Sequence, residues 1–265
     1  MKQNCFDFII CGAGASGLLL LKAIREDSFF NEKSILIIEK EIKNVNDRTW
    51  SYWESPNGSF DSILSKKWSK ANFCSEDFNS DFDLNPYQYK MLRSAAFYQS
   101  IRNKYSKLKN TIFLHAEVKN IDSKNIMTEV ITSEGKFQSK KVFNSLFDPK
   151  PMINQKKYPV LQQHFVGWFI KTKKPSFDSS KVFFMDFNIP QVQETRFIYV
   201  LPIDKHNALV EYTLFSENLL HFDDYETGIK AYLDSKGITE FEIEEKEQGN
   251  IPMTCFPFEK LNCRS

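Results

Sequence analysis

A glycine-rich turn near the N-terminus constrains the fold of this 265-residue chain more than any other feature. The turn spans residues 12–17, reads GAGASG, and therefore has the G-x-G-x-x-G spacing. It directly follows the apolar run 6–11 and precedes the leucine-rich segment 16–25. These patterns predict a buried strand followed by a helix. A second apolar run at 34–39 predicts another buried strand, so the segment is typical of a βαβ unit with a parallel pair of strands.

In this context each glycine has a physical task in binding a dinucleotide. Gly12 permits the tight turn, Gly14 lets the backbone approach a pyrophosphate, and Gly17 allows close packing of helix and strand. The N-terminus of the following helix offers free N–H groups and the positive end of its dipole to the phosphates. The predicted cofactor-binding residues of the loop are Gly12, Ala13, Gly14, Ala15, Ser16 and Gly17.

Glu39 completes the predicted nucleotide site. It lies 22 residues beyond Gly17, at the carboxyl end of the second predicted strand. A carboxylate at that place accepts hydrogen bonds from ribose hydroxyls and repels a 2′-phosphate. The site is therefore expected to hold FAD or NAD rather than NADP. The alternative interpretation is an ordinary surface glutamate that ends a strand.

The remainder of the chain predicts a second, sheet-rich domain. From Lys43 to Tyr89 there is little periodicity, which favours a long loop that covers a ligand. A helix is predicted over 94–108, and Gly237 is expected to close another over 223–236. The predicted strands are 111–117, 126–132, 137–143, 162–171, 181–187, 196–201, 207–215 and 241–245, with a hairpin turn at 133–135. We therefore expect an α/β (α+β) chain, with a Rossmann-like nucleotide-binding domain at 1–148 and a mainly antiparallel-sheet substrate domain at 149–265.

Composition excludes several other classes of protein. The formal net charge is +1 and no basic stripe is present, which argues against nucleic-acid binding. The five cysteines form no C-x-x-C pair, so neither a disulfide framework nor a zinc site is expected, and a reducing compartment fits better. Glycines, a serine and a lysine interrupt the apolar stretch 6–24, and no cleavage-like site follows. We expect a cytoplasmic protein without signal peptide or membrane span.

Seven strings are not explained by a generic dinucleotide-binding unit. They are DRTWSYWE (47–54), YKMLR (89–93), QHFVGW (163–168), MDF (185–187), FIYVLP (197–202), ALVEYT (208–213) and GNIPMT (249–254). In this order and at these spacings the chain resembles the FAD-dependent lycopene cyclase family of carotenoid biosynthesis, over nearly its whole length. Members of that family continue beyond the position of Ser265 with a second glycine-containing flavin motif and a largely helical portion. The resemblance therefore implies a chain that lacks the C-terminal part.

The resemblance implies a flavoprotein that cyclises the linear ends of lycopene into β-ionone rings, giving γ-carotene and β-carotene. The reaction has no net redox change but requires reduced FAD, with NAD(P)H as the electron source. The implied fold is similar to that of flavoprotein monooxygenases and geranylgeranyl reductases. Because lycopene or another linear carotenoid partitions into lipid, peripheral association with a membrane is also expected.

The acidic residue of the family carries over to Glu211, the predicted catalytic acid. Strand alternation independently places Leu209, Glu211, Thr213 and Phe215 on one face. Burial beside apolar side chains raises the pKa of a carboxyl group and keeps it protonated, as the protonation of an alkene requires. The alternative is an exposed carboxylate on a half-buried strand.

Other residues in these strings are candidates of lower rank. Arg48 and Arg93 are predicted to contact flavin or phosphate, or else to form structural ion pairs. The tentative substrate residues are Trp53, Glu54, Trp168 and Asp186, the tryptophans as channel lining or core and the two acids as further proton donors. His164 is interpreted as a satisfied core histidine.

Two other functions remain open from the sequence. One is a related FAD-dependent oxidoreductase, a hydroxylase or reductase acting on an isoprenoid. The other is an inactive fragment that only binds a nucleotide.

Overall fold

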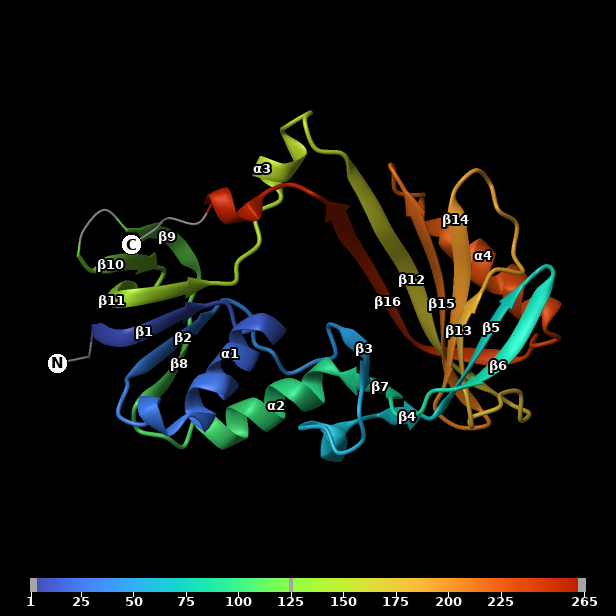
Figure 1. Ribbon diagram of the computed structural model, residues 1–265, viewed down its shortest axis with the longest axis horizontal. Coiled ribbons are helices and arrows are strands. Elements are labelled where there is room, and N and C mark those ends of the chain that lie inside the picture. The colour runs from blue at the N-terminus through green and yellow to red at the C-terminus, as the bar shows by residue number, and fades with distance from the viewer. Residues whose placement is uncertain (1–3, 124–125, 262–265) are drawn as a thin grey trace. The chain divides into compact units, whose positions relative to one another are not determined.

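The computed structural model describes residues 4–123 and 126–261, and the chain divides into two compact units (Figure 1). The first unit contains the described residues up to Asn46, the segment Ser94–Pro151, and the described residues from Pro257 onward. The second contains Asp47–Arg93 and Met152–Phe256. This division differs from a single boundary after residue 148, because Asp47–Arg93 belongs to the second unit and the last described residues belong to the first.

A six-stranded sheet forms the first unit. In spatial order its strands are β8 (Thr111–His115), β2 (Ile35–Glu39), β1 (Cys5–Cys11), β11 (Gly135–Asn144), β10 (Thr128–Thr132) and β9 (Val118–Asp122). The pairs β8–β2, β2–β1 and β1–β11 are parallel, whereas β10 and β9 extend the sheet in an antiparallel arrangement. The N-terminal strand thus lies inside the sheet, where both of its edges are paired.

The helix α1 (Ala15–Glu26) connects β1 to β2 and confirms the predicted βαβ unit. The first four residues of β2 are buried, as expected for a central parallel strand. α1 buries Leu18, Leu21 and Ile24, and a second helix, α2 (Ser94–Tyr105), contacts it. The described residues also contain the short helices η1 (Ser28–Phe30), η2 (Asp61–Ile63), α3 (Lys150–Ile153) and η3 (Phe258–Leu261).

The second unit contains a seven-stranded sheet and a smaller three-stranded sheet. The larger sheet runs β16 (Phe241–Thr254), β12 (Val160–Thr172), β15 (Asn207–Ser216), β14 (Thr195–Pro202), β13 (Val182–Asp186), β5 (Lys70–Ser75) and β6 (Phe78–Asp83). Its pairs are antiparallel except for β13–β5. The smaller sheet runs β3 (Thr49–Glu54), β7 (Gln88–Arg93) and β4 (Lys66–Trp68).

The two faces of the larger sheet pack against different elements. One face carries Val210 and Tyr212 and packs against the helix α4 (Phe222–Ser235). The helix approaches closely because Gly228 has no side chain: an added Cβ would lie 2.6 Å from the Tyr212 ring. The opposite face carries Leu209, which packs with Met91 of β7 in the smaller sheet. The alternation of β15 therefore separates a helix-covered face from a face that bears Glu211.

The prediction of a long loop from Lys43 to Tyr89 was wrong. This stretch contains β3, β4, β5, β6 and the start of β7. The strands are short, and many of their residues are only partly buried, so polar and aromatic residues mix without a clear period. Their partners are also distant, since β5 pairs with β13. The strand β9 was not predicted, and β16 continues through Thr254 rather than ending near Glu245.

The other predicted strands and helices are present, with ends shifted by a few residues. The hairpin between β10 and β11 has its turn at 133–134, as expected, and Gly135 adopts a φ of +131°. Gly237, with a φ of +71°, follows α4 and ends it as predicted. Among the helices of the described residues, none combines the length and apolar character needed to cross a membrane.

Candidate active site

The glycine loop between β1 and α1 has the geometry that its spacing predicted. Gly12 has a φ of +98°, which side-chain-bearing residues rarely adopt. A Cβ on Gly17 would lie 2.1 Å from the Gly12 carbonyl oxygen and 3.1 Å from Cγ2 of Ile10. Beside Gly14, in contrast, an added Cβ meets nothing within 4 Å. The loop therefore packs tightly against β1 at Gly17 and leaves free space beside Gly14.

The N-terminus of α1 is available to an anion. Gly14 is the N-cap residue, so no side chain caps the helix, and its first turn, which includes Ala15 and Ser16, contains no acidic residue. The first intrahelical hydrogen bond at this end runs from Leu18 N to Gly14 O at 3.0 Å. The backbone N–H groups that precede Leu18 in the helix can therefore bind a ligand, next to the positive end of the helix dipole.

Glu39 lies beside this loop, at the end of β2. Its Oε2 accepts a hydrogen bond from Ala13 N at 2.8 Å, and its Oε1 accepts one from Glu41 N at 3.0 Å. Ala13, Glu39, Tyr98 and Phe113 line the same small depression in the surface of the first unit. An open glycine, free helix amides and a carboxylate at the strand end fit the pyrophosphate and ribose of a dinucleotide.

Glu211 lies in the middle of β15, on the face opposite α4. Thr213 Oγ1 donates a hydrogen bond of 2.7 Å to Glu211 Oε1, so the two residues share a face as the alternation predicted. The side chain is half-buried, and burial raises the pKa of its carboxyl group to about 8. The hydrogen bond from Thr213 opposes this rise, and the charge of Glu247 adds to it. The carboxyl group is thus mainly protonated at neutral pH.

Aromatic rings gather next to this acid. Tyr199 is the cross-strand neighbour of Glu211, and its ring lies 5.6 Å from that of Phe184. Phe184 in turn contacts Tyr89 at 5.4 Å and Trp53 at 5.2 Å, measured between ring centroids. Burial raises the pKa of Tyr89 to about 12, and the nearby charge of Glu211 contributes to this rise. The acid therefore lies beside a cluster of aromatic rings, which the predicted residue Trp53 joins through Phe184.

The two predicted arginines are held within the second unit. Arg93 Nη2 donates to both carboxylate oxygens of Glu245 at 2.6 Å, and its guanidinium lies 4.0 Å from the centroid of the Phe169 ring. Arg48 is exposed and donates from Nη1 to the Asp47 carbonyl at 2.6 Å. Arg93 thus forms the structural ion pair that was one of its two predicted roles. Contact of either arginine with a cofactor remains a prediction.

Trp168 and Asp186 are not brought together with Glu211, because both lie on the helix-covered face. Trp168 Nε1 donates to Glu226 of α4 at 3.2 Å. Asp186 is almost fully buried, accepts a hydrogen bond from the Tyr232 hydroxyl at 2.9 Å, and pairs with Lys236 at 3.1 Å. The sheet itself separates these two side chains from the acid.

Glu54 and His164 each bind neighbouring side chains within the second unit, which gives both residues a structural role. Glu54 Oε2 lies 2.9 Å from Nζ of Lys90, whose side chain is fully buried and also pairs with Asp61 at 2.5 Å. The two ring nitrogens of His164 lie 2.5 Å from the Tyr225 hydroxyl and 2.7 Å from the Ser216 hydroxyl. His164 is therefore the satisfied core histidine that the sequence indicated.

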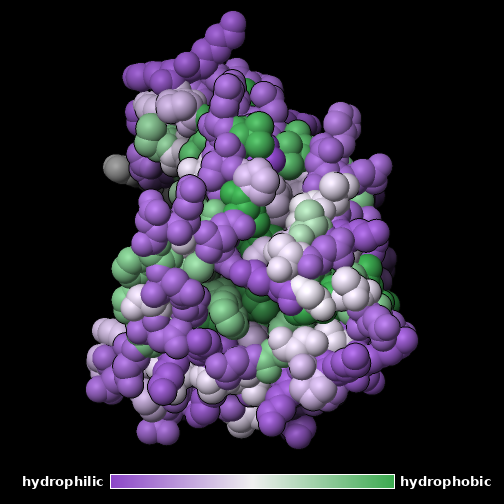
Figure 2. All heavy atoms as spheres, turned by 90° about the vertical axis from the view of Figure 1, so that its right-hand side faces the viewer, coloured by the Kyte–Doolittle hydropathy of each residue, from purple (hydrophilic) through white to green (hydrophobic). Residues whose placement is uncertain are grey.

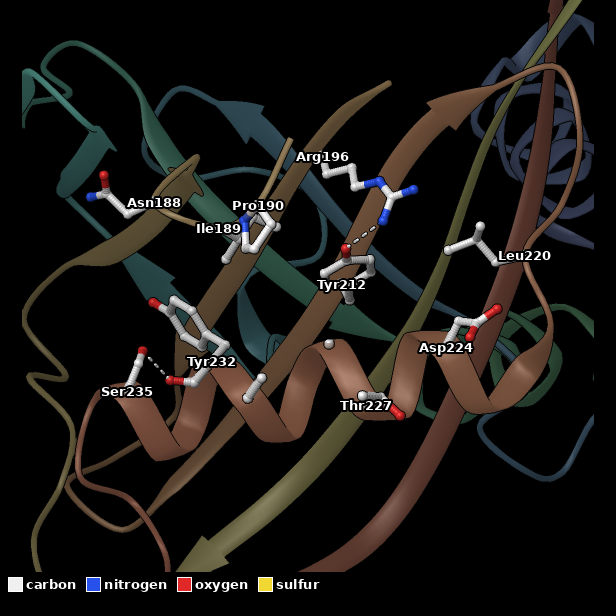
Figure 3. Close-up of a pocket in the computed structure, with 12 residues that line it drawn as sticks. Asn188, Ile189, Pro190, Arg196, Tyr212, Leu220, Asp224, Thr227, Tyr232 and Ser235 are labelled. Carbon is white, nitrogen blue, oxygen red and sulfur yellow. Dashed lines mark hydrogen bonds between the residues drawn. The ribbon is translucent and has the colours of Figure 1, made fainter. Parts of the chain in front are cut away.

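A groove of about 500 Å³ lies on the helix-covered face of the second unit. Figure 2 shows this side of the molecule, where apolar side chains gather around a hollow with hydrophilic ones around them. In Figure 3, Arg196 and Tyr212 project from the sheet toward α4, and the Arg196 guanidinium points at the Tyr212 hydroxyl. Arg196 also pairs with Glu194 at 2.7 Å. The cation of the groove is thus already paired, and its carboxylate, Asp224, is exposed, unlike that of Glu211.

Sequence reasoning missed Gly167, Tyr199 and Glu247 as neighbours of Glu211. Gly167 and Tyr199 are the direct cross-strand partners of Glu211, and Glu247 is the partner of Gly167 on its other side. All three lie in or next to strings that the sequence had singled out. The local sequence, however, does not indicate which strands pair with one another. It therefore could not predict that these three residues lie next to Glu211 in the sheet.

Solved structures with a similar fold include a reductase-like protein, a flavin-dependent brominase and a monooxygenase. A geranylgeranyl bacteriochlorophyll reductase-like protein from Thermoplasma acidophilum is 12% identical, with a TM-score of 0.67, over 94% of this chain and 67% of that one. The flavin-dependent brominase Bmp2 is 14% identical, with a TM-score of 0.65, over 96% and 69%. The p-nitrophenol 4-monooxygenase PnpA from Pseudomonas putida DLL-E4 is 13% identical, with a TM-score of 0.65, over 96% and 69%. The chain thus spans about two thirds of the length of each.

These likenesses confirm the predicted fold class, since the chain shares its fold with a monooxygenase and a geranylgeranyl reductase-like protein. A comparison with curated protein sequences gives no significant match. The family model described as "Lycopene cyclase protein" matches residues 7–261, which is nearly the whole chain and includes the glycine loop, Glu39 and Glu211. The chain therefore belongs to the lycopene cyclase protein family.

Proposed function

We propose that this protein is a lycopene β-cyclase that requires reduced FAD and converts the linear ends of lycopene into β-ionone rings. The observation that carries the proposal is the environment of Glu211 in a chain of the lycopene cyclase family. Burial raises the pKa of its carboxyl group to about 8, and aromatic rings lie beside it. Acid-catalysed cyclisation needs a proton donor that stays protonated at neutral pH and faces an apolar substrate.

The chemistry begins with proton transfer from Glu211. Its O–H bond breaks as the terminal double bond of the substrate takes the proton, which leaves a tertiary carbocation. The neighbouring double bond attacks this centre and closes the six-membered ring, and loss of a ring proton forms the product alkene. No electrons are gained or lost overall, so the ring-closing steps are an isomerisation.

The surroundings of Glu211 suit the cationic intermediates. Tyr199, Phe184 and Tyr89 form a cluster of aromatic rings beside it, and aromatic rings attract a cation most strongly where water is excluded. Residues Gly12–Gly17 and Glu39 would hold the ADP half of FAD by its pyrophosphate and ribose. Bound reduced flavin would supply an electron-rich surface that stabilises positive charge. NAD(P)H as the electron source and peripheral attachment to a membrane belong to the same proposal.

Pigment analysis tests the function directly. The chain is expressed in cells that accumulate lycopene, and the carotenoids are separated by chromatography. Monocyclic γ-carotene and bicyclic β-carotene are the expected products. An oxygenated or saturated pigment would instead identify an oxidoreductase. Unchanged lycopene in cells that contain folded, FAD-loaded protein would contradict the cyclase assignment.

The rate of cyclisation is expected to fall as the pH rises above about 8, because Glu211 acts in its protonated form and burial raises its pKa to about 8. Above that pH each further unit leaves roughly tenfold less acid. The ionisable groups that face Glu211 are Tyr89 of β7, Tyr199 of β14 and Glu247 of β16. Both tyrosines have raised pKa values, so Glu211 titrates before them.

The measurement is the initial rate between pH 6 and pH 9.5, with lycopene in phosphatidylcholine vesicles, FAD and NADPH. Flavin fluorescence at each pH controls for loss of the cofactor. A rate that stays level or increases up to pH 9 would exclude Glu211 as the acid.

A further inference from the structure

A second carboxyl group stands in the same row of the sheet as Glu211. Gly167 of β12 pairs with Glu211 of β15 on one side and with Glu247 of β16 on the other. Residues directly opposite one another in neighbouring strands point to the same face. Glu211 and Glu247 therefore rise from one face of the sheet, with a single residue between them, and that residue has no side chain.

The missing side chain of Gly167 lets side chains from both neighbouring strands approach it. A Cβ on Gly167 would lie 2.9 Å from Leu209 Cδ1, 3.3 Å from Glu247 Cγ and 3.5 Å from Glu211 Cβ. The stems of both glutamates therefore border the space above the glycine, together with the Leu209 side chain. A larger residue here would press on all three side chains.

Each carboxyl group has its own hydroxyl donor. Thr213 Oγ1 donates to Glu211 Oε1 at 2.7 Å, and Thr49 Oγ1 donates to Glu247 Oε2 at 2.6 Å. Each group keeps a second oxygen that these hydroxyls do not use. The arrangement holds both side chains in place and leaves each able to exchange a proton.

The charges around the two acids differ. Burial raises the pKa of Glu247, but the guanidinium groups of Arg93 and Arg48 oppose this rise, whereas the charge of Glu245 adds to it. For Glu211, burial and the charge of Glu247 both raise the pKa. When two neighbouring carboxyl groups hold one proton, such a difference decides which of them carries it. Here the two guanidinium groups favour the charged form of Glu247, and the charge of Glu247 favours the neutral form of Glu211.

We propose that Glu211 and Glu247 form a catalytic carboxyl pair, in which Glu211 gives a proton to the alkene and Glu247 takes the proton that the ring loses. This inference rests on the proposed cyclase function and adds the base that completes the reaction. Glu211 becomes a carboxylate when its O–H bond breaks. Glu247 forms a new O–H bond as the ring C–H bond breaks and its electron pair becomes the product double bond. The proton then returns from Glu247 to Glu211, which resets the site without an oxidant or reductant.

Replacing Glu247 by glutamine tests the pair. Glu247→Gln is expected to lower turnover by roughly 10²-fold or more, the usual contribution of a general base. Glu247→Asp keeps a carboxylate but shortens its reach, so about a tenfold loss is expected, within the range of such effects. Glu244→Gln is the matched control, because it makes the same charge change at an exposed position of the same strand. It is expected to leave turnover unchanged. Wild-type turnover in Glu247→Gln or in Glu247→Asp overturns the proposal.

A titration without substrate or flavin provides an independent readout. The Glu211 carboxyl is followed by ¹³C NMR in the wild type and in Glu247→Gln, or in Glu247→Asp if the glutamine variant does not fold. Loss of the neighbouring charge in Glu247→Gln shifts the titration of Glu211 to lower pH. In Glu247→Asp, the more distant carboxylate gives a smaller shift in the same direction. An unchanged titration overturns the pair, even if the variants are less stable.

The outcomes separate this inference from the function on which it rests. If the wild-type chain leaves lycopene unchanged, the cyclase function itself fails. If the wild type cyclises lycopene, Glu211→Gln does not, and Glu247→Gln does so at the wild-type rate, only the carboxyl pair fails.

Discussion

Replacing Glu211 by glutamine is expected to lower the rate of lycopene cyclisation by roughly 10²- to 10⁴-fold, the contribution that a positioned general acid usually makes. Glutamine has nearly the same shape and can still accept the hydrogen bond from Thr213, but it has no acidic proton to give. The rate is measured with lycopene vesicles, and the product is checked in lycopene-accumulating cells. FAD binding, which uses the other unit of the chain, is expected to stay at the wild-type level.

The same variant should change how stability depends on pH. Burial raises the pKa of Glu211 from 4.5 to about 8, so between these values the carboxyl group loses its proton in the unfolded chain but keeps it in the folded protein. The free energy of unfolding therefore falls as the pH rises through this interval. The unfolding temperature of the wild type should therefore fall more steeply between pH 5 and pH 9 than that of Glu211→Gln. Glu217→Gln, at an exposed position just after β15, is the control. Wild-type cyclisation by Glu211→Gln would refute the acid role.

Replacing Gly17 by alanine is expected to abolish FAD binding. The added Cβ would lie 2.1 Å from the Gly12 carbonyl oxygen and 3.1 Å from Cγ2 of the fully buried Ile10, and neither atom can move aside cheaply. Separating α1 from β1 would distort the turn that places the phosphates at the helix N-terminus. We expect at least a hundredfold weaker binding in a fluorescence titration, and a loss of stability of about 1–3 kcal/mol, as is usual for overpacking.

Gly14→Ala is the informative control for this variant. No atom lies within 4 Å of a Cβ at Gly14, so the free protein should keep its unfolding temperature. Any loss of FAD binding in Gly14→Ala would then come from the methyl group entering the space of the ligand. If Gly17→Ala bound FAD as tightly as the wild type, the loop would not be the cofactor site.

The nucleotide unit was largely predictable because its signal is local. Strand, glycine turn, helix and second strand follow one another within the first forty residues, so spacing alone determines where Gly12, Gly17 and Glu39 lie. The shared face of Glu211 and Thr213 was predictable for the same reason, since alternation along one strand is a local property.

The surroundings of Glu211 were not predictable, because they depend on the pairing of distant strands. Glu247 faces Glu211 only because β12 lies between β15 and β16 in a particular register. The same uncertainty affected Trp168 and Asp186. The family-like strings that contain them suggested a role at the substrate site, but not the face of the sheet on which each side chain lies. Alternation within a strand defines two faces, and only the tertiary packing decides which one α4 covers.

The division of the chain into units has a consequence for how it can be dissected. The polypeptide passes from one unit to the other at residues 46–47, 93–94, 151–152 and 256–257, so neither unit is one continuous segment. A protease cut or a gene fusion at residue 148 would leave Asp47–Arg93 on the wrong fragment, separated from the β13 strand that pairs with β5. Nascent chains face the same constraint, since β1 must wait for β11 before its second edge is paired. Neither unit can therefore be cut out as one continuous segment, so both are poor candidates for independent expression or exchange between relatives.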